Sequence, residues 1–464
     1  MKTTIISKAS LLLGMIILLG SCDKKDDPTP RVSPDSNEAA NNWILAVMSE
    51  VYYWLDDIRT PIAVTSDPTQ YFNSLLNKPT DRFSAIYPDY QELINSLSGI
   101  SLDAGYEFTL FRASESSNDV VAEITYVKKN SPAESAGIVR GDVITAINGT
   151  TLTLDNYQGL LGQIQETHSI SYLSYNEGQD IYQAQEDISL TPIELQENPI
   201  YLDTVYTIGS QKIGYLVYNF FAPDPGNSSG SYDLELDEIF ASFKSQSINS
   251  LIVDFRYNGG GYVGSAINLA SLIAPGVSST TVFSKTKYND LISAAIPELN
   301  DVKTNFLDKS QNVGASLEGN AVYVLTSSRT ASASELIING LKPYMEVFLI
   351  GELTTGKNVG SVAFEDEENP QNRFGMLPIV SQSFNSLDES DYSNGFAPNI
   401  QALEYEERLK PLGDVNEILL RKAIEQITGT PSSARFKKLD RVDQGSSLDS
   451  KVRYGRMVEN NIFK

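Results

Sequence analysis

From residue 213 to residue 350 the chain alternates apolar runs with amphipathic segments, and this alternation constrains its fold more than any other feature. The expected strands are 213–220, 251–255, 322–326 and 347–350, and the expected helices are 234–243, 266–273 and 333–341. Strands joined through helices pair in parallel, because such a crossover returns the chain to the same edge of the sheet. The pattern therefore predicts an α/β core, which we place at residues 196–430.

Two smaller units precede this core in the sequence. Apolar residues recur at three- and four-residue steps from Trp43 to Leu55, which predicts an amphipathic helix and a small helical domain at 38–99. From 100 to 195, short alternating strands and turn signals predict a β-rich domain. We therefore expect a multidomain chain that combines α/β and α+β architecture, with a loose polar tail at 431–464 containing a short final strand.

The beginning of the chain has the anatomy of an export signal. Lys2 and Lys8 give a basic start, and the apolar run that follows is too short to span a bilayer. Leu19-Gly-Ser-Cys22 resembles a lipobox, which implies a lipoprotein signal peptide at 1–22 and lipidation of Cys22. An ordinary secretory signal with a chance cysteine is the alternative.

Residues 23–37 are rich in Pro, Asp and Ser and are expected to be a flexible tether. Their first part, Asp23-Lys-Lys-Asp-Asp27, resembles the acidic tag that sends some Gram-negative lipoproteins to the outer leaflet. We therefore expect a cell-envelope location as an outer-membrane lipoprotein, on the periplasmic or the surface-exposed face. The N-terminal lipid anchor would hold the protein to the membrane.

Composition excludes several kinds of site. The chain has a formal net charge of −24, which argues against a nucleic acid partner. It holds a single histidine, His168, and a single cysteine, Cys22, so we expect neither a hydrolytic zinc site nor a serine hydrolase site with a histidine base. We expect no metal and no cofactor, and we interpret His168 as a structural or surface residue. An oligomer is possible.

Ser332 and Lys357 are the candidates for chemistry that needs no histidine. Ser332 stands at the start of the expected helix 333–341, where free backbone amides and the helix dipole favour developing negative charge. Lys357 follows 25 positions later, after the strand 347–350 has returned the chain to the same sheet edge. A serine nucleophile with a lysine base is therefore the arrangement that the composition leaves open.

A glycine-rich segment follows another expected strand end. Asn258-Gly-Gly-Gly261 comes directly after the strand 251–255, and a glycine backbone allows close approach of a substrate. We expect the amide of Gly259 or Gly260, together with the amide of Ala333, to form an oxyanion hole.

Part of the β-rich region resembles a PDZ domain. The resemblance rests on Asn130-Ser-Pro-Ala-Glu-Ser-Ala-Gly-Ile138, followed by Gly141-Asp-Val-Ile144 and Ile147-Asn-Gly149. PDZ domains bind a C-terminal peptide as an added strand and hold its carboxylate on backbone amides. By this resemblance the peptide-binding segment is Gly105-Tyr106-Glu107-Phe108, and protein or peptide C-terminal tails are the expected partners.

From residue 105 to about residue 400 the chain resembles the carboxyl-terminal processing proteases of family S41. The resemblance rests on the PDZ-like segment, then Asp254-x-Arg-x-Asn-Gly-Gly-Gly261, then Ala331-Ser-Ala-Ser-Glu335, then Thr354-x-Gly-Lys357. It implies a ClpP/crotonase-like α/β protease core with an inserted or preceding PDZ domain. It also implies a serine endopeptidase that cleaves exported proteins near their C-termini.

The same resemblance assigns roles to single residues. It implies that Ser332 is the nucleophile and Lys357 the general base, with Glu335 and Thr354 near the site. Where many members carry a glutamine downstream of the lysine, this chain has Ser361.

Two alternatives to a peptidase remain. One is a catalytically weak or inactive PDZ peptide-binding lipoprotein of the same fold. The other is a nucleotide-binding loop at 351–358, which is one residue short of the P-loop pattern and is followed by an expected strand instead of a helix.

Overall fold

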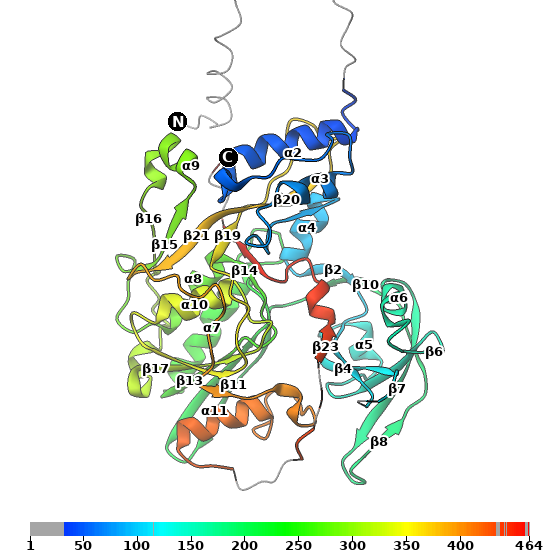
Figure 1. Ribbon diagram of the computed structural model, residues 1–464. Helices are drawn as coiled ribbons and strands as arrows, with labels where there is room; N and C mark the ends of the chain where they lie inside the picture. Colours follow the sequence, from blue (N-terminus) through cyan, green and yellow to red (C-terminus); the bar gives the residue numbers. More distant parts are fainter. Residues whose placement is uncertain are drawn as a thin grey trace, which may run out of the picture.

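The computed structural model describes residues 32–114, 116–432, 437–439, 441, 443–459 and 463. The expected signal peptide at 1–22, with Cys22, lies outside the described residues, as does most of the expected tether at 23–37. Among the described residues, no helix combines the length and the apolar composition that a membrane span requires. Figure 1 shows an N-terminal unit packed on one end of a large core, and a β-rich unit beside that core.

The core is built on a six-stranded sheet in the order β11-β12-β13-β17-β18-β22. Its strands are β11 (Ile200–Ile208), β12 (Gln211–Tyr218), β13 (Ser250–Asp254), β17 (Ala321–Thr326), β18 (Glu346–Gly351) and β22 (Ile400–Gln401). Neighbouring strands pair in parallel except β11 and β12, which form an antiparallel hairpin. This pairing confirms the parallel α/β arrangement predicted from the alternation.

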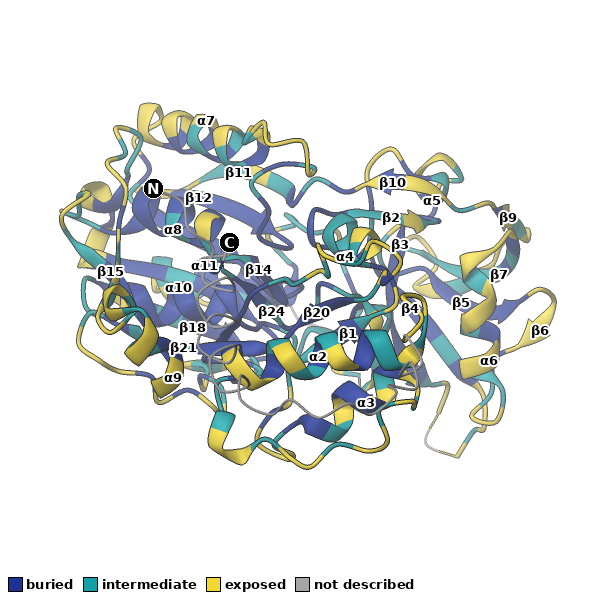
Figure 2. Ribbon diagram, turned by 90° about the horizontal axis from the view of Figure 1, so that it is seen from above, coloured by how far each residue is buried: buried dark blue, intermediate teal, exposed yellow. Residues whose placement is uncertain are grey.

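Helices cover both faces of this sheet. The helices on one face are α7 (Ser231–Ser245), α8 (Val263–Ile273) and α10 (Ala333–Leu341), and α11 (Ile418–Thr428) lies on the other. Side chains alternate between the faces as strand geometry requires: Leu216 and Tyr218 pack with the first group, and Tyr215 and Val217 pack with α11. The strands are therefore buried on both sides, as Figure 2 shows in dark blue.

A second six-stranded sheet lies against the core, in the order β14-β24-β19-β21-β15-β16. Its strands are β14 (Gly260–Tyr262), β24 (Arg456–Val458), β19 (Val359–Ser361), β21 (Ile379–Asn385), β15 (Val282–Tyr288) and β16 (Val302–Asn305). β24 pairs in parallel with β14 on one side and with β19 on the other. The glycine-rich strand and the strand after Lys357 are thus joined through a strand from the end of the chain.

The N-terminal unit is helical. It contains α2 (Asn37–Val51), η1 (Leu55–Asp57), α3 (Pro68–Leu75), β1 (Ala85–Tyr87) and α4 (Tyr90–Leu97). Asp67 and Asp89 cap the starts of α3 and α4 with their carboxylates, which accept from backbone amides of the first turn. β1 pairs antiparallel with β20 (Gly375–Leu377) of the core, so this unit is fastened to the core by a strand.

The β-rich unit spans residues 100–196. It contains β2 (Ile100–Asp103), β3 (Tyr106–Arg112), β4 (Val120–Val127), α5 (Pro132–Ser135), β5 (Val143–Ile147), β6 (Thr150–Thr151), α6 (Tyr157–Leu161), η2 (Gly162–Gln165), β7 (His168–Asn176), β8 (Ile181–Ala184), β9 (Ile188–Leu190) and β10 (Ile193–Gln196). Its sheet runs β3-β4-β5-β7-β8, and β2 pairs with β10 where the unit joins the core.

The C-terminal segment differs from the expected loose tail. It contains β23 (Asp443–Ser446), η7 (Ser447–Ser450) and β24, and the first of these pairs antiparallel with β3 of the β-rich unit. Figure 1 shows this segment, in red, between the core and the β-rich unit. The expectation of a loose tail is therefore wrong for residues 443–459, which are held by strand pairing at both ends, whereas the expected short final strand is present as β24 (Arg456–Val458). The remaining elements are α9 (Asp290–Ala295), η3 (Pro297–Leu299), η4 (Gly314–Ser316), η5 (Glu318–Asn320) and η6 (Glu404–Glu406).

Candidate active site

Ser332 lies between the end of β17 and the first residue of α10. Its backbone has φ 65° and ψ −115°, a conformation that residues other than glycine rarely adopt. Its hydroxyl is fully buried, and Oγ has no hydrogen-bond partner among the described residues. A strained backbone and an unpartnered buried hydroxyl are typical of a functional position, because neither feature stabilises the fold.

Glu335 holds the backbones of Ser332 and Lys357 together. Its Oε2 atom accepts from the amide of Ser332 and from the amide of Lys357, both at 2.8 Å. Its Oε1 atom accepts from Thr354 Oγ1 at 2.6 Å and from the Gly356 amide at 2.7 Å. Burial raises the pKa of Glu335, while these four donors act in the opposite direction. The carboxylate therefore fixes the start of α10 against the loop that carries the lysine.

Lys357 is completely buried. Its Nζ donates to the carbonyl oxygen of Gly455 at 2.8 Å and lies 5.3 Å from the centre of the Phe83 ring. Burial, followed by the nearby positive charge of Arg456, lowers the pKa of this amine well below its ordinary value. A neutral amine at this position can accept a proton, which is the property that a lysine base requires.

Gly260 lies directly against Ser332. A Cβ atom at Gly260 would be 2.7 Å from Ser332 Cβ and 3.0 Å from Ser332 Oγ, and its φ is +110°. A Cβ atom at Gly259 would be 2.7 Å from a ring carbon of Tyr454. The glycines predicted to allow close approach of a peptide backbone are thus in contact with the serine and with the C-terminal segment.

The backbone amides expected to form the oxyanion hole, those of Ala333, Gly259 and Gly260, have different surroundings. Ala333 is the first residue of α10, where helix geometry leaves the amides without an intrahelical acceptor. The Gly260 amide donates to Asn258 Oδ1 at 2.9 Å, so in this structure it is already engaged. The Gly259 carbonyl accepts from the Arg456 amide at 3.2 Å.

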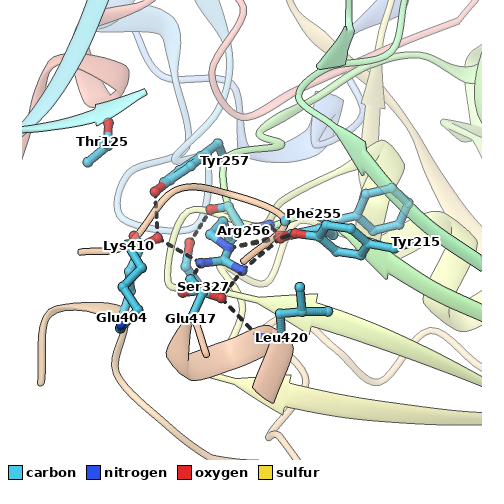
Figure 3. Close-up of polar contacts among 12 residues, drawn as sticks. Thr125, Tyr215, Phe255, Arg256, Tyr257, Ser327, Glu404, Lys410, Glu417 and Leu420 are labelled. Atoms are coloured by element: carbon cyan, nitrogen blue, oxygen red, sulfur yellow. Dashed lines mark hydrogen bonds and ion pairs between the residues drawn. The ribbon is translucent and has the colours of Figure 1, made fainter. Parts of the chain in front are cut away.

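A buried charge network supports the loop that precedes Ser332 (Figure 3). The fully buried Arg256 guanidinium contacts Asp254 at 2.7 Å and Glu417 at 2.6 Å, and a third carboxylate, Glu404, at 2.8 Å. Ser327 Oγ donates to the Arg256 carbonyl at 2.5 Å. The sequence analysis included Arg256 in the motif Asp254-x-Arg-x-Asn-Gly-Gly-Gly261 but assigned it no role, although a charged pair directly after a buried strand was a signal for one.

The network reaches the β-rich unit. Arg140 of that unit donates to Glu404 at 2.6 Å and to the Tyr257 hydroxyl at 2.5 Å. Burial acts to raise the pKa of Glu404, but the positive charges of Arg140 and Arg256 outweigh it and lower this pKa to about 2. The site loop and the β-rich unit are therefore held by one set of ion pairs.

Comparison with known proteins places this arrangement in a family. The model of Peptidase family S41 matches residues 212–401, that of the peptidase S41 N-terminal domain matches 39–85, and that of a PDZ domain matches 123–170. The chain belongs to peptidase family S41. Its architecture is accordingly a multidomain α/β fold with a PDZ domain in the β-rich unit.

Relatives and solved structures agree with this placement. A CtpA-like serine protease of Staphylococcus saprophyticus is 23% identical over 253 residues, covering 54% of this chain and 45% of the relative. A CtpA-like serine protease of Staphylococcus aureus strain bovine RF122 is 25% identical over 240 residues, covering 51% and 42%. The S41 chain thus spans less than half the length of these curated relatives. A crystal structure described as an S41 protease from Bacteroides fragilis NCTC 9343 has a TM-score of 0.71 and 28% identity, covering 84% of this chain and 98% of that one.

The PDZ segment expected to bind peptide is occupied in this S41 chain by its own C-terminal segment. Ser447 Oγ donates to Glu107, and the Phe108 amide donates to Ser447 Oγ at 2.9 Å. Gly105 bonds within the unit, since its carbonyl accepts from the Lys128 amide at 2.8 Å. Tyr106 points its hydroxyl at His168 Nε2, 2.9 Å away, so His168 is a buried structural residue of the PDZ domain.

Thr354 and Ser361, two further residues expected near the site of this S41 chain, differ in their hydrogen bonding. Thr354 accepts from the Phe396 amide at 2.8 Å while donating to Glu335, which links the lysine loop to the segment after it. Ser361 Oγ is buried without a partner among the described residues, and the Ser361 carbonyl accepts from the Glu459 amide at 2.9 Å. β19 follows Lys357 as a strand, so the nucleotide-binding alternative at 351–358 lacks the helix it needs.

Proposed function

We propose that this protein is a serine endopeptidase of the C-terminal processing type, which cleaves exported proteins near their C-termini with Ser332 as nucleophile and Lys357 as base. The observation that carries the proposal is the Glu335 carboxylate, one oxygen of which binds the backbone amides of both residues at 2.8 Å. Family membership supports a serine-type peptidase, and the fold places both residues at the edge of the same sheet.

The electrostatics of Lys357 support its role as a base. An exposed lysine is protonated at neutral pH and cannot accept a proton, whereas a buried one with a lowered pKa can. In the proposed reaction the neutral amine takes the proton of the Ser332 hydroxyl as Oγ attacks the carbonyl carbon of the substrate. The ammonium then returns this proton to the leaving amine, and a water molecule, activated by the same amine, hydrolyses the acyl-enzyme.

Charge develops on the substrate carbonyl oxygen during the attack. The Ala333 amide, at the start of α10, and the Gly259 amide are the donors that we assign to it. Gly260 contributes by its lack of a side chain, because any Cβ would occupy the space beside Ser332 Oγ. Its own amide would need to leave Asn258 before it could take part.

The PDZ domain supports peptide tails as substrates, because its β3 edge pairs with an extended segment. We further propose that the protein is an outer-membrane lipoprotein of the cell envelope, anchored through Cys22. The support for this is the sequence of the first 22 residues alone. Incorporation of labelled palmitate by the full chain, lost in Cys22→Ala, tests the anchor.

A fluorophosphonate probe that labels reactive serines tests the peptidase assignment. We expect labelling of the wild type, none of Ser332→Ala, and strongly reduced labelling of Lys357→Met, which removes the amine and keeps a similar volume. Ser328→Ala removes an exposed hydroxyl from the same loop and should label as the wild type does. Equal labelling of Ser332→Ala and wild type would exclude Ser332 as the nucleophile.

A peptide-binding protein without catalysis is the second candidate. The observation in its favour is that Ser332 Oγ has no partner while Lys357 Nζ bonds to Gly455 O, so the two side chains are not hydrogen-bonded to each other. Peptide binding by a protein that labels with no probe, even after release of the C-terminal segment described below, would favour this candidate.

A further inference from the structure

The C-terminal segment at 443–459, which we call the tail segment, runs from the PDZ domain to the second sheet of the core (Figure 1). It begins as β23 on the edge of β3 and ends as β24 between β14 and β19. Between these two strands, Gly455 O accepts from Lys357 Nζ, and Tyr454 lies against Gly259. One continuous stretch of backbone therefore contacts both the PDZ edge and the proposed base.

The PDZ end of the tail segment is bound as an added strand. β23 pairs antiparallel with β3, with Asp443 opposite Phe111 and Ser446 opposite Thr109. Ser446 Oγ also donates to the Phe108 carbonyl at 2.7 Å. Strand addition at an exposed sheet edge is the general way in which an extended peptide is recognised, so the tail segment takes a position that a peptide from elsewhere could take.

The other end of the tail segment, β24, lies between β14 and β19, two strands that do not pair with each other directly. We call this position the slot. β14 carries the glycines beside Ser332, and β19 begins two residues after Lys357. β24 satisfies both edges, with Arg456 opposite Gly260 and Val458 opposite Ser361. An extended chain in this slot passes directly by the serine and the lysine, which is the path that a peptide to be cleaved must follow.

The side chains of the tail segment match the charge of the surface beneath it. Lys451 Nζ lies 2.8 Å from Asp103 and 3.0 Å from Glu107. Arg453 lies 2.6 Å from Glu197 and stacks over the Phe220 ring at 4.2 Å. Glu107 and Glu197 are buried and Asp103 is half-buried, and Lys128 of the PDZ domain contacts all three carboxylates. Lys128 balances one of the three negative charges, and two basic side chains on a bound peptide balance the other two.

Building on the proposed function, we propose that the tail segment is an internal occupant of the substrate track, and that the substrates are peptides with two basic side chains two positions apart, on a turn between two extended stretches. Lys451 and Arg453 mark these positions. A substrate displaces the tail segment, adds to the β3 edge and to the slot between β14 and β19, and places its basic side chains on Asp103, Glu107 and Glu197. The same acidic surface then determines which peptides bind and holds the tail segment over the site in their absence.

The resident segment is arranged so that it is not cleaved. Lys357 directs an N–H at Gly455 O, and Ser332 Oγ bonds to neither the amine nor the tail segment. A scissile carbonyl would instead have its oxygen at the Ala333 amide and its carbon beside Ser332 Oγ. Displacement of the tail segment frees the amine to bond to the hydroxyl.

The first experiment uses the full chain with Lys451→Glu and Arg453→Glu together, which places like charges beside the acidic cluster. We expect the amides of β24 to lose protection from hydrogen exchange and the rate of fluorophosphonate labelling to rise at least tenfold. The control, Lys303→Glu with Lys422→Glu, makes the same change of net charge on half-exposed side chains elsewhere and should leave both unchanged. Loss of protection without faster labelling would overturn the proposal.

A second full-length variant, Gly455→Val, releases the tail segment by strain. Gly455 has φ +63°, and a Cβ there meets nothing within 4 Å, so the substitution strains only the backbone. Its fluorophosphonate labelling should also be at least tenfold faster than that of the wild type. If both variants keep β24 protected and react no faster than the wild type, the tail segment is a fixed part of the sheet and the proposal fails.

The substrate class is tested with a synthetic peptide of residues 443–459 on the released variant, made in the Ser332→Ala background so that binding is read without cleavage. We expect fluorescence anisotropy to report binding at least tenfold tighter than that of the same peptide with glutamates at positions 451 and 453. Equal affinity of the two peptides would refute the basic substrate class. Cleavage of the same peptide is then measured on the released variant with Ser332 intact. Preferential binding without any cleavage would refute the proposed peptidase function alone, and cleavage without preferential binding would refute the substrate track alone.

Discussion

Replacing Glu335 by glutamine is the sharpest perturbation that the site offers, because it keeps the shape of the side chain and removes only charge and one acceptor. Each carboxylate oxygen of Glu335 accepts two hydrogen bonds, and all four partners are donors. Thr354 Oγ1 accepts from the Phe396 amide and keeps a second lone pair, so it can accept from a glutamine NH₂ group, but the three backbone amides cannot. A glutamine NH₂ group in place of Oε2 faces the amides of Ser332 and Lys357, and one in place of Oε1 faces the amide of Gly356.

The magnitude follows from this count. One or two charge-assisted hydrogen bonds are lost, each worth about 1.5–3 kcal/mol, so we expect the free energy of unfolding to fall by about 1.5 to 6 kcal/mol. Turnover should fall by more than stability alone explains. The amides of Ser332 and Lys357 lose the charged oxygen that they share, and a displacement of about 1 Å at a reacting group costs roughly 100-fold in rate.

Urea denaturation and steady-state cleavage of a fluorogenic peptide measure the two effects on Glu335→Gln. Glu346→Gln makes the same chemical change at an exposed position in β18 and should alter neither quantity. A Glu335→Gln protein within about 0.5 kcal/mol of wild-type stability, which is the range of an ordinary surface substitution, would refute the reasoning. So would unchanged turnover.

Three further predictions concern neighbouring groups. Because the amine of Lys357 must be neutral to act and its pKa is lowered, kcat/KM should rise with pH and level off well below 10.5; a profile still rising there contradicts a buried base. Arg256→Met leaves three carboxylates around a missing cation and should cost about 3–5 kcal/mol in a denaturation experiment, while Arg59→Met on the surface should cost almost nothing; equal stability of the two variants speaks against the network. Gly260→Ala puts a Cβ 2.3 Å from Arg456 O and should expose β24 to hydrogen exchange, whereas Gly264→Ala in α8 has free space and should not; undisturbed exchange in Gly260→Ala would mean that β24 is not held against Gly260.

The core was predictable because its signals are local. Strand and helix periods at 213–350 identify the elements, and the helix expected at 333–341 coincides with α10 (Ala333–Leu341). Parallel pairing then follows from the length of the connections. The amides joined by Glu335 could not be derived in this way, because the positive φ of Ser332 and the side-chain direction of Glu335 depend on the packing around them.

The tail segment was misjudged for the opposite reason. The sequence indicated a short final strand, which is present as β24, but three residues without a periodic pattern do not show which strands it pairs with. Its partners at Gly260 and Ser361, and the carboxylates that bind Lys451 and Arg453, lie far away in the sequence. Long-range pairing of short strands is set by the surfaces that remain unpaired once the rest of the chain has folded, and these surfaces are not visible in a single sequence.

Both ends of the described chain reach the lysine loop. Arg82 of the N-terminal unit donates to the Gly356 carbonyl at 3.0 Å, and Gly455 bonds to Lys357 from the other end. A growing polypeptide can form the first contact long before the second, which must wait until residue 455 has been made. During synthesis there is therefore an interval in which Ser332, Lys357 and the glycine strand are present but β24 is not.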